Sequence, residues 1–373
     1  MVTPDPGVMR AALAAGRTHR GHTWPNPSVG CILIDPKTNA VIAQGCTQPG
    51  GRPHAEIDAL NKAGERARGA IAYITLEPCN HTSPGKPVSC CDALANAGVA
   101  AVVMAIPDPD PRMAGRSLLQ LRARAIETHI DLEADAAHHA HIGFITRLAL
   151  GRPRVTLKLA HSRDSMLGLP GTRTTISSPQ SWQRTFLQRS KVDAVMVGLG
   201  TVLADDPELT DRRDGITANP IRIIIDTHAR TPLTSKLVRT LAQVPTWIVC
   251  SEDADSTALE QAGLRIIPCP VSNGKIDMDA ALQTLGKIGL THILCEGGAT
   301  LAKDLLLQGL VDEALIMQGA NDIGAGGIPM PAINLVLRNE EKIGADIWRM
   351  YDSQGVLDST RAFFSDLQKI LPE

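Results

Sequence analysis

One histidine and three cysteines stand at positions where their types and spacing suit metal binding. The sequence reads His54-Ala55-Glu56, then Pro78-Cys79, then Cys90-Cys91. Zinc favours imidazole and thiolate ligands, and a catalytic zinc takes three protein ligands and leaves a fourth position for water. We therefore predict that His54, Cys79 and Cys90 bind a catalytic zinc ion.

Glu56 is predicted to be the catalytic acid and base of this site. A zinc-held water has a pKa near ~7, and a carboxylate two residues after a ligating histidine can lie beside that water and carry its proton. Two alternatives are weighed: the cysteines are small buried hydrophobic residues, or the zinc is structural. A structural zinc needs a fourth ligand, and Cys91 would point about 100° away from Cys90 on a helix.

The hydrophobic periodicity of the first 150 residues predicts alternating helices and strands. Helices are expected at 8–15, 54–63, 90–97 and 131–150, and strands at 29–34, 41–43, 70–76 and 100–106. The strands at 29–34 and 41–43 are predicted to form a hairpin. His54 and Cys90 would then each open a helix, where a thiolate is favoured over a thiol.

A domain boundary is predicted at Gly151, because Gly151-Arg152-Pro153 interrupts the pattern just before a new strand at 155–159. Further strands are expected at 194–197, 221–225, 247–250, 264–267 and 292–295, and helices at 180–189, 279–285, 300–308 and 348–371. Such alternation predicts an α/β fold with a largely parallel sheet. The predicted domains are 1–150 and 151–373.

Composition and charge argue against several classes of partner. The formal charge is -2 and aromatic residues are 3 % of the chain, which disfavours nucleic-acid binding and a charged membrane surface. The longest apolar runs are shorter than the ~20 residues of a membrane span. Eight cysteines in 373 residues are not a disulfide framework, so we expect a reducing, cytoplasmic location.

An apolar strand runs into Gly297-Gly298, and a helix is expected to begin near Ala299. Unpaired N–H groups at such a helix start can bind a phosphate or pyrophosphate. A tight strand-to-helix turn with no ligand explains the same residues equally well. This motif alone leaves both interpretations open.

The zinc motifs resemble those of the nucleoside and nucleobase deaminases. Ten residues separate Cys79 from Cys90, and this spacing, together with the segments 25–31 and 51–56, is similar to the bifunctional deaminase/reductase family of riboflavin biosynthesis. The resemblance implies an N-terminal cytidine-deaminase-like three-layer α/β/α domain and a C-terminal dihydrofolate-reductase-like α/β domain. It implies zinc-dependent hydrolytic deamination of 2,5-diamino-6-(5-phosphoribosylamino)pyrimidin-4-one, followed by NADPH reduction of the ribosyl to the ribityl side chain.

The resemblance also assigns binding residues, all to a small-molecule substrate or to NADPH. In the first domain, the residues matched to substrate contacts are Asn26, His81 and Lys86. In the second domain, those matched to the ribosyl substrate are Arg189, Leu209, Arg212 and Glu296. Those matched to NADPH are Ala160, Thr201, Asp205, Thr227, Gly298, Ala299, Thr300, Leu301 and Ala302. Lys158 is placed near the reacting end, and the family implies a homo-oligomer. Lys86 could equally be a solvated loop residue, and Arg189 or Arg212 could instead be an ordinary surface arginine.

The chain departs from the family pattern mainly in its second half. Ser165 and Met166 stand where the family has Gly and a basic residue, and Arg173 and Thr175 where it has Ser and Trp. An alternative function is therefore a monofunctional zinc deaminase with a degenerate reductase domain. A nucleic-acid-editing deaminase is disfavoured by the charge, and a non-enzymatic zinc module by Glu56 beside the open site.

Overall fold

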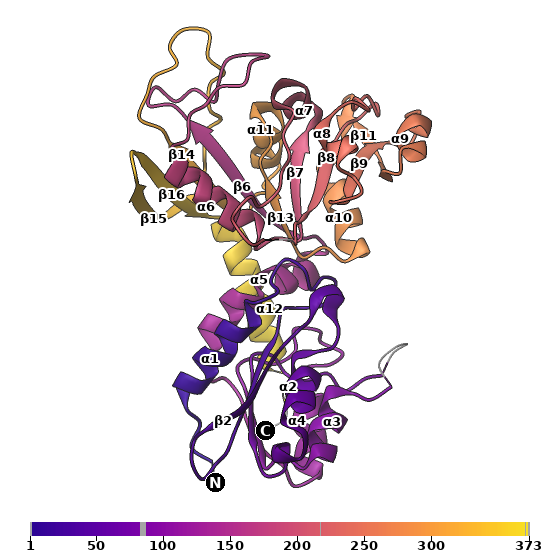
Figure 1. Ribbon diagram of the computed structural model, residues 1–373, viewed down its shortest axis with the longest axis vertical. Helices are drawn as coiled ribbons and strands as arrows, with labels where there is room; N and C mark the ends of the chain where they lie inside the picture. Colours follow the sequence, from indigo (N-terminus) through magenta and orange to yellow (C-terminus); the bar gives the residue numbers. More distant parts are fainter. Residues whose placement is uncertain (1, 83–86, 217, 370, 372–373) are drawn as a thin grey trace. The chain divides into compact units, whose positions relative to one another are not determined.

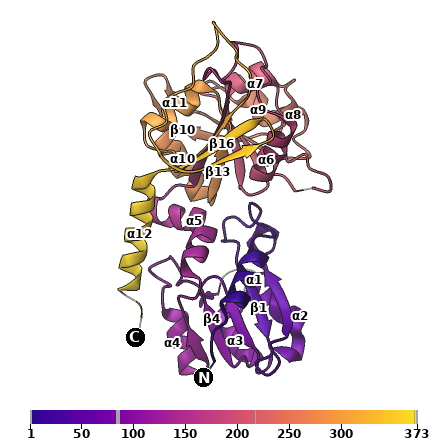
Figure 2. The same cartoon turned by 90° about the vertical axis from the view of Figure 1, so that its left-hand side faces the viewer.

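The computed structural model describes residues 2–82, 87–216, 218–369 and 371 (Figures 1 and 2). The chain divides into two compact units: unit 1 comprises Met1–Leu150 and Ser359–Glu373, and unit 2 comprises Gly151–Asp358. The second unit therefore ends before the predicted limit at 373, because the last segment packs with the first unit. No helix among the described residues has the length and apolar character needed to cross a membrane.

Unit 1 is a three-layer α/β/α structure, as the family resemblance implies (Figure 1). Its sheet has the order β2 (Val41–Cys46), β1 (Gly30–Ile34), β3 (Ile71–Ile74), β4 (Ala101–Met104) and β5 (Glu127–His129). Strand β1 is antiparallel to β2 and β3, which confirms the predicted hairpin, whereas β3, β4 and β5 are parallel. One face carries α1 (Pro6–Gly16) and α5 (Ala134–Leu150). The other carries α2 (Ala55–Ala63), α3 (Cys90–Ala97) and α4 (Arg116–Ala123). The 3-10 turns are η1 (Pro49–Gly51) and η2 (Gly64–Ala67).

Two local features fix the helices that begin at the predicted ligands. The Ser89 side chain accepts a hydrogen bond from the Asp92 N–H and caps α3, and left-handed Gly98 ends that helix. Helix α2 lies directly against β2 at Gly45, where an added Cβ would lie 2.2 Å from the Ala55 carbonyl oxygen. This close approach needs glycine, and it sets the position of the first turn of α2.

The C-terminal segment belongs to the core of unit 1. Helix α12 (Gln354–Gln368) carries Phe363 and Phe364, which pack against the hydrophobic core of unit 1. The ring of Phe364 also meets His138 of α5 edge-to-face, with 4.9 Å between the ring centroids. These contacts explain why residues from Ser359 onward group with the first unit.

Unit 2 is built on a nine-stranded sheet with helices on both faces (Figure 2). The strand order is β10 (Arg265–Cys269), β9 (Thr246–Ser251), β8 (Ile221–Ile225), β7 (Ala194–Gly198), β13 (His292–Cys295), β6 (Arg154–His161), β14 (Glu313–Gln318), β16 (Asp346–Asp352) and β15 (Val336–Ile343). The first seven are parallel, β16 is antiparallel to β14, and β15 is antiparallel to β16. The helices are α6 (Pro179–Arg189), α7 (Leu199–Asp205), α8 (Lys236–Arg239), α9 (Thr257–Gln261), α10 (Met278–Ile288) and α11 (Ala299–Leu307). A small hairpin joins β11 (Val271–Ser272) and β12 (Lys275–Ile276).

The single closing helix predicted at 348–371 is wrong. Residues 346–352 form strand β16, and the helix begins only at Gln354. Burial alternates along the start of this strand. Trp348 is buried, and its Nε1–H donates to the hydroxyl of Ser181 in α6 at 2.9 Å. Pairing with β14 and burial of Trp348 stabilise a strand where the local pattern is ambiguous. Strands β14 and β15 lie outside the predicted elements.

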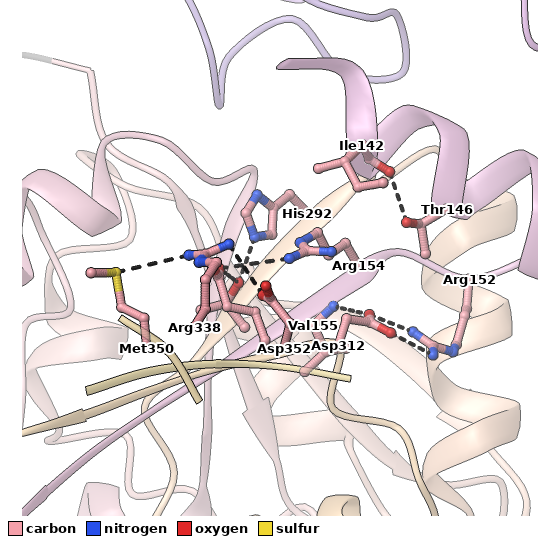
Figure 3. Close-up of polar contacts among 12 residues, drawn as sticks. Ile142, Thr146, Arg152, Arg154, Val155, His292, Asp312, Arg338, Met350 and Asp352 are labelled. Atoms are coloured by element: carbon pink, nitrogen blue, oxygen red, sulfur yellow. Dashed lines mark hydrogen bonds and ion pairs between the residues drawn. The ribbon is translucent and has the colours of Figure 1, made fainter. Parts of the chain in front are cut away.

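A buried ionic cluster lies where β6 and β14 begin (Figure 3). Arg152 makes two hydrogen bonds of 2.8 Å to the Asp312 carboxylate. Glu313 accepts from Arg338 at 2.9 Å and from the Thr156 hydroxyl at 2.9 Å. Burial opposes ionisation of Glu313, but Arg154, His292 and Arg338 prevail and lower its pKa to about 2.

This cluster predicts a stability change in acid. Because the folded-state pKa of Glu313 lies below its ordinary value of 4.5, its contribution is present above pH 4.5 and is lost as the pH falls toward 2. The Glu313→Gln variant should therefore be less stable than wild type at pH 7, by at most about 3 kcal/mol, and the gap should close by pH 2–3. Denaturant unfolding of both proteins across that range measures the gap, and a gap that is independent of pH would contradict the assignment.

Candidate functional sites

Unit 1 brings together the three predicted metal ligands. The donor atoms of His54, Cys79 and Cys90 all lie within 4.8 Å of one another. His54 Nδ1 is 3.6 Å from Cys79 Sγ and 3.4 Å from Cys90 Sγ. Tetrahedral zinc, with Zn–S near 2.3 Å and Zn–N near 2.0–2.1 Å, separates such atoms by about 3.6 Å. The donor set and its spacing therefore fit zinc.

Each donor is positioned by the end of a regular element. His54 is the residue before α2, Cys90 is the first residue of α3, and Cys79 follows β3. Glu56 lies in the first turn of α2 and is only 4 % exposed. Burial raises the pKa of the Glu56 carboxyl, the neighbouring Cys79 raises it further, and His54 opposes both effects.

Cys91 has a different environment from Cys90. Its Sγ lies 3.9 Å from the Ser117 carbonyl oxygen, and its side chain belongs to the hydrophobic core. Burial raises the pKa of the Cys91 thiol to about 12. Cys91 is therefore a core residue, whereas Cys90 turns toward His54.

A cavity of about 130 Å³ is lined by two of the three donors, His54 and Cys79, together with Glu56, Asn26 and His81. The Asn26 amide donates to the Gly51 carbonyl oxygen at 3.1 Å, which fixes its orientation. Lys86, the third predicted substrate contact, lies outside the described residues.

Other acidic residues of this cavity were not predicted. Glu77, Asp108 and Asp110 line it beside the metal donors. Glu77 accepts hydrogen bonds from the backbone N–H groups of Asp108, Gly115 and Ser117, so it holds the loop that follows β4. Burial raises the pKa of Asp108 to about 7. The sequence contains a signal for Asp108 and Asp110, since the run Asp108-Pro109-Asp110-Pro111 comes just after a predicted strand.

Unit 2 has two adjoining cavities at the carboxyl ends of its parallel strands, where ligands bind in open α/β sheets. Their volumes are about 600 Å³ and 240 Å³. The two share lining residues, among them Thr201, Asp205 and Gly298. They therefore form one continuous site with a larger and a smaller compartment.

The larger compartment contains most of the residues matched to NADPH. Thr227, Gly298, Ala299, Thr300 and Leu301 line it. No side chain caps α11, and the Gly298 N–H donates to the Thr201 hydroxyl at 3.2 Å. Ala302 does not line either compartment, because it is fully buried in the core. Ala160 lines the smaller compartment instead.

The smaller compartment is organised by a buried ion pair. The Arg189 guanidinium makes two hydrogen bonds to the Glu296 carboxylate, of 2.7 and 2.9 Å. Lys158 lies beside this pair and is 8 % exposed. Burial lowers the pKa of Lys158, and Glu296 opposes that shift. Burial likewise disfavours the Glu296 carboxylate, but Arg189 and Lys158 lower the pKa of Glu296 overall.

The structure distinguishes the adjacent arginines 212 and 213. Arg212 lines the smaller compartment together with Leu209, and its guanidinium lies 5.0 Å from the Phe186 ring centroid. Arg213 pairs with Asp211 at 2.7 Å and lines neither compartment. Arg173, which stands where the family has Ser, also lines the smaller compartment. Trp182 and Lys236 line it as well and were not among the predicted site residues. No local motif marks Trp182 or Lys236, because the fold collects them from separate segments.

Comparison with protein-family models gives the class of each half. Residues 3–106 match the cytidine and deoxycytidylate deaminase zinc-binding region, and residues 153–347 match the RibD C-terminal domain. The chain thus joins a zinc-binding deaminase domain to a reductase domain of the NADPH-dependent type.

Full-length relatives give the family. The chain is 37 % identical over 325 residues to the riboflavin biosynthesis protein RibD of Escherichia coli strain K12, covering 84 % of this chain and 86 % of that protein. It is 35 % identical over 371 residues to the RibD of Haemophilus influenzae, covering 93 % and 97 %. The solved structure of Acinetobacter baumannii RibD, form 1, superposes with a TM-score of 0.83 at 30 % identity, covering 93 % of this chain and 98 % of that chain. The chain belongs to the RibD family of riboflavin biosynthesis proteins, which are deaminase/reductase enzymes.

Proposed function

We propose that unit 1 hydrolytically deaminates 2,5-diamino-6-(5-phosphoribosylamino)pyrimidin-4-one and that unit 2 reduces the ribosyl group of the product to ribityl with NADPH. The observation that carries this proposal is the set of three zinc-type donors within 4.8 Å beside the buried carboxylate of Glu56. A Thermotoga maritima structure with the same fold, at a TM-score of 0.81 and 24 % identity, is named for the corresponding deaminase and reductase.

For the deaminase step, we propose that His54, Cys79 and Cys90 hold zinc. When bound, zinc lowers the pKa of a water toward ~7 and so makes it a nucleophile at neutral pH. Glu56, buried in the same cavity, would take one proton from the attacking water and pass it to the ring nitrogen. It would then carry a second proton, from the hydroxyl that has formed on the ring carbon, to the amine, which departs as ammonia when its bond to that carbon breaks. Asn26 and His81 contact the substrate from the cavity wall, and Lys86 contributes charge toward its phosphate.

For the reductase step, we propose that NADPH occupies the larger compartment against Thr227 and residues 298–301, with Thr201 and Asp205 at the junction of the two compartments. NADPH supplies a hydride equivalent. The ribosyl substrate lies in the smaller compartment, where Arg189, Glu296 and Leu209 orient it. Lys158, buried beside Glu296, would donate the proton that the ring oxygen of the sugar takes as its bond to the anomeric carbon breaks, and the hydride equivalent from NADPH would be added to that carbon.

Arg212 is proposed to bind the substrate phosphate, which gives a matched pair of variants. We expect Arg212→Ala to raise the KM of the reductase for its phosphorylated substrate about tenfold or more, since hydrogen bonds to charged groups contribute roughly 1.5–3 kcal/mol. Arg213→Ala removes a cation of the same type that is paired with Asp211 and lies outside both compartments, so it should leave KM unchanged. Steady-state kinetics on both variants tests this, and equal effects of the two substitutions would contradict the assignment.

The proposal as a whole is tested with the purified full chain. Ammonia release from the diaminopyrimidine substrate reports on unit 1, and NADPH oxidation with the deaminated intermediate reports on unit 2. Both activities are expected. Ammonia release without NADPH oxidation at any cofactor concentration would favour the alternative of a monofunctional deaminase.

We further propose that the enzyme is a cytoplasmic homo-oligomer with no nucleic-acid partner. None of the eight cysteines forms a disulfide among the described residues, which agrees with a reducing compartment. The oligomer is implied by the family resemblance, and light scattering on the purified chain measures it.

A further inference from the structure

Helix α6 presents two aromatic rings to the cations of the smaller compartment. Trp182 and Phe186 are one helical turn apart, with ring centroids separated by 5.9 Å. Lys158 Nζ lies 5.7 Å from the Trp182 centroid, and the guanidinium groups of Arg189 and Arg212 lie 5.7 and 5.0 Å from that of Phe186. At these distances the ring faces attract the cations. One side of α6 therefore helps to arrange the charged groups of the reductase site.

Within this pair, Trp182 is the ring that reaches the compartment itself. Among the described residues that line the smaller compartment, Trp182 is the single aromatic one. Phe186 lies underneath, 8 % exposed and outside the lining. Trp182 is half-buried, and its indole N–H has no protein acceptor among the described residues. A tryptophan with only a structural role usually buries its ring and satisfies this donor, as Trp348 does.

The position of Trp182 associates its ring with the compartment proposed for the substrate and not with the one proposed for the cofactor. Trp182 lines the smaller compartment and not the larger one. The cations of the smaller compartment, Arg212 among them, suit a phosphate ester, but the remaining walls are mostly small, aliphatic or charged. The reductase substrate also carries a flat pyrimidine ring, and rings of this kind gain affinity by stacking on aromatic side chains.

We propose that Trp182 is the aromatic surface against which the pyrimidine ring of the reductase substrate stacks, an inference that rests on the proposed reductase function of unit 2. Trp182 is thus a specificity-determining contact for the base, separate from the groups that hold the sugar and phosphate. Its contact with Lys158 places the bound ring beside the proton donor.

Binding measurements without NADPH test this proposal, because they do not depend on turnover. We compare the full-length wild-type chain with Trp182→Leu and Trp182→Phe, using calorimetry with 5-amino-6-(5-phosphoribosylamino)uracil and, as a probe that lacks the base, ribose 5-phosphate. Trp182→Leu should weaken binding of the aminouracil about tenfold or more. Trp182→Phe should lose much less, because a smaller aromatic face remains. Ribose 5-phosphate should bind all three proteins with Kd values within about twofold of one another.

Each other outcome overturns the inference. Equal losses for both ligands would mean that Trp182 only shapes the compartment. Unchanged aminouracil affinity in Trp182→Leu would mean that the base does not contact this ring. A loss confined to NADPH affinity, measured in parallel, would assign Trp182 to the cofactor. Failure of wild type to bind either phosphorylated ligand would instead refute the proposed reductase function itself.

Discussion

Replacing Glu56 by glutamine should reduce ammonia release by the full chain about 10²–10⁴-fold, the usual contribution of a positioned proton-transfer group. Glutamine is nearly isosteric and cannot accept the proton at the same atom. Because Glu56 is not one of the three clustered donors, the variant should still contain one zinc per chain, as measured by elemental analysis.

The same variant contains its own control. Glu56 belongs to unit 1, whereas the reductase residues belong to unit 2. NADPH oxidation with the deaminated intermediate should therefore match wild type. Undiminished ammonia release by Glu56→Gln would remove Glu56 from the mechanism, and a loss of zinc would make it a ligand.

The adjacent cysteines should behave in opposite ways when each is replaced by alanine. Cys90→Ala removes a donor that lies 3.4 Å from His54 Nδ1, so we expect loss of tightly bound zinc and of deaminase activity. Cys91→Ala removes a thiol that faces the core and the Ser117 carbonyl oxygen. It should keep both zinc and activity, with a stability cost of the order of 1 kcal/mol for the small cavity.

Zinc content and ammonia release, measured on both purified variants, decide between the two cysteines. If Cys91→Ala loses the metal and Cys90→Ala keeps it, the ligand assignment is wrong by one residue. Loss of zinc from both variants would indicate that the first turn of α3 cannot tolerate either change. Thermal unfolding of each variant identifies that case.

The cluster of three candidate metal donors could be predicted from the sequence because its geometry is mostly local. Ser89 and Gly98 cap α3, which was predicted with the bounds that the structure has, and His54 directly precedes α2. When a metal-donor side chain stands at the start of a helix, the helix backbone sets the direction in which that side chain points. The spacing of a few residues therefore carries most of the information about where His54 and Cys90 point.

The reductase compartment could be predicted only in part, because its walls come from distant segments. Strand β14 is held in place by pairing with β6 and β16, which are distant from it in the sequence. The residues of β14 show no clear hydrophobic periodicity that would reveal this pairing. Trp182 and Lys236 line the same compartment although more than fifty residues lie between them in the sequence. Their types are ordinary surface or helix residues, so nothing local distinguishes them. Asp108 was missed for a similar reason, since its environment depends on Glu77 from another strand end.

Helix α12 has a consequence for any attempt to separate the two activities. In chain order, unit 2 is an insertion within unit 1, since the polypeptide starts in unit 1 and returns to it after Asp358. A single cut after Leu150 would leave a deaminase fragment without Phe363 and Phe364, with the apolar surface beneath them exposed to water. Such a fragment tends to aggregate for reasons unrelated to its active site. The two reactions are best dissected by point variants in the intact chain, where each catalytic half keeps all of its own core.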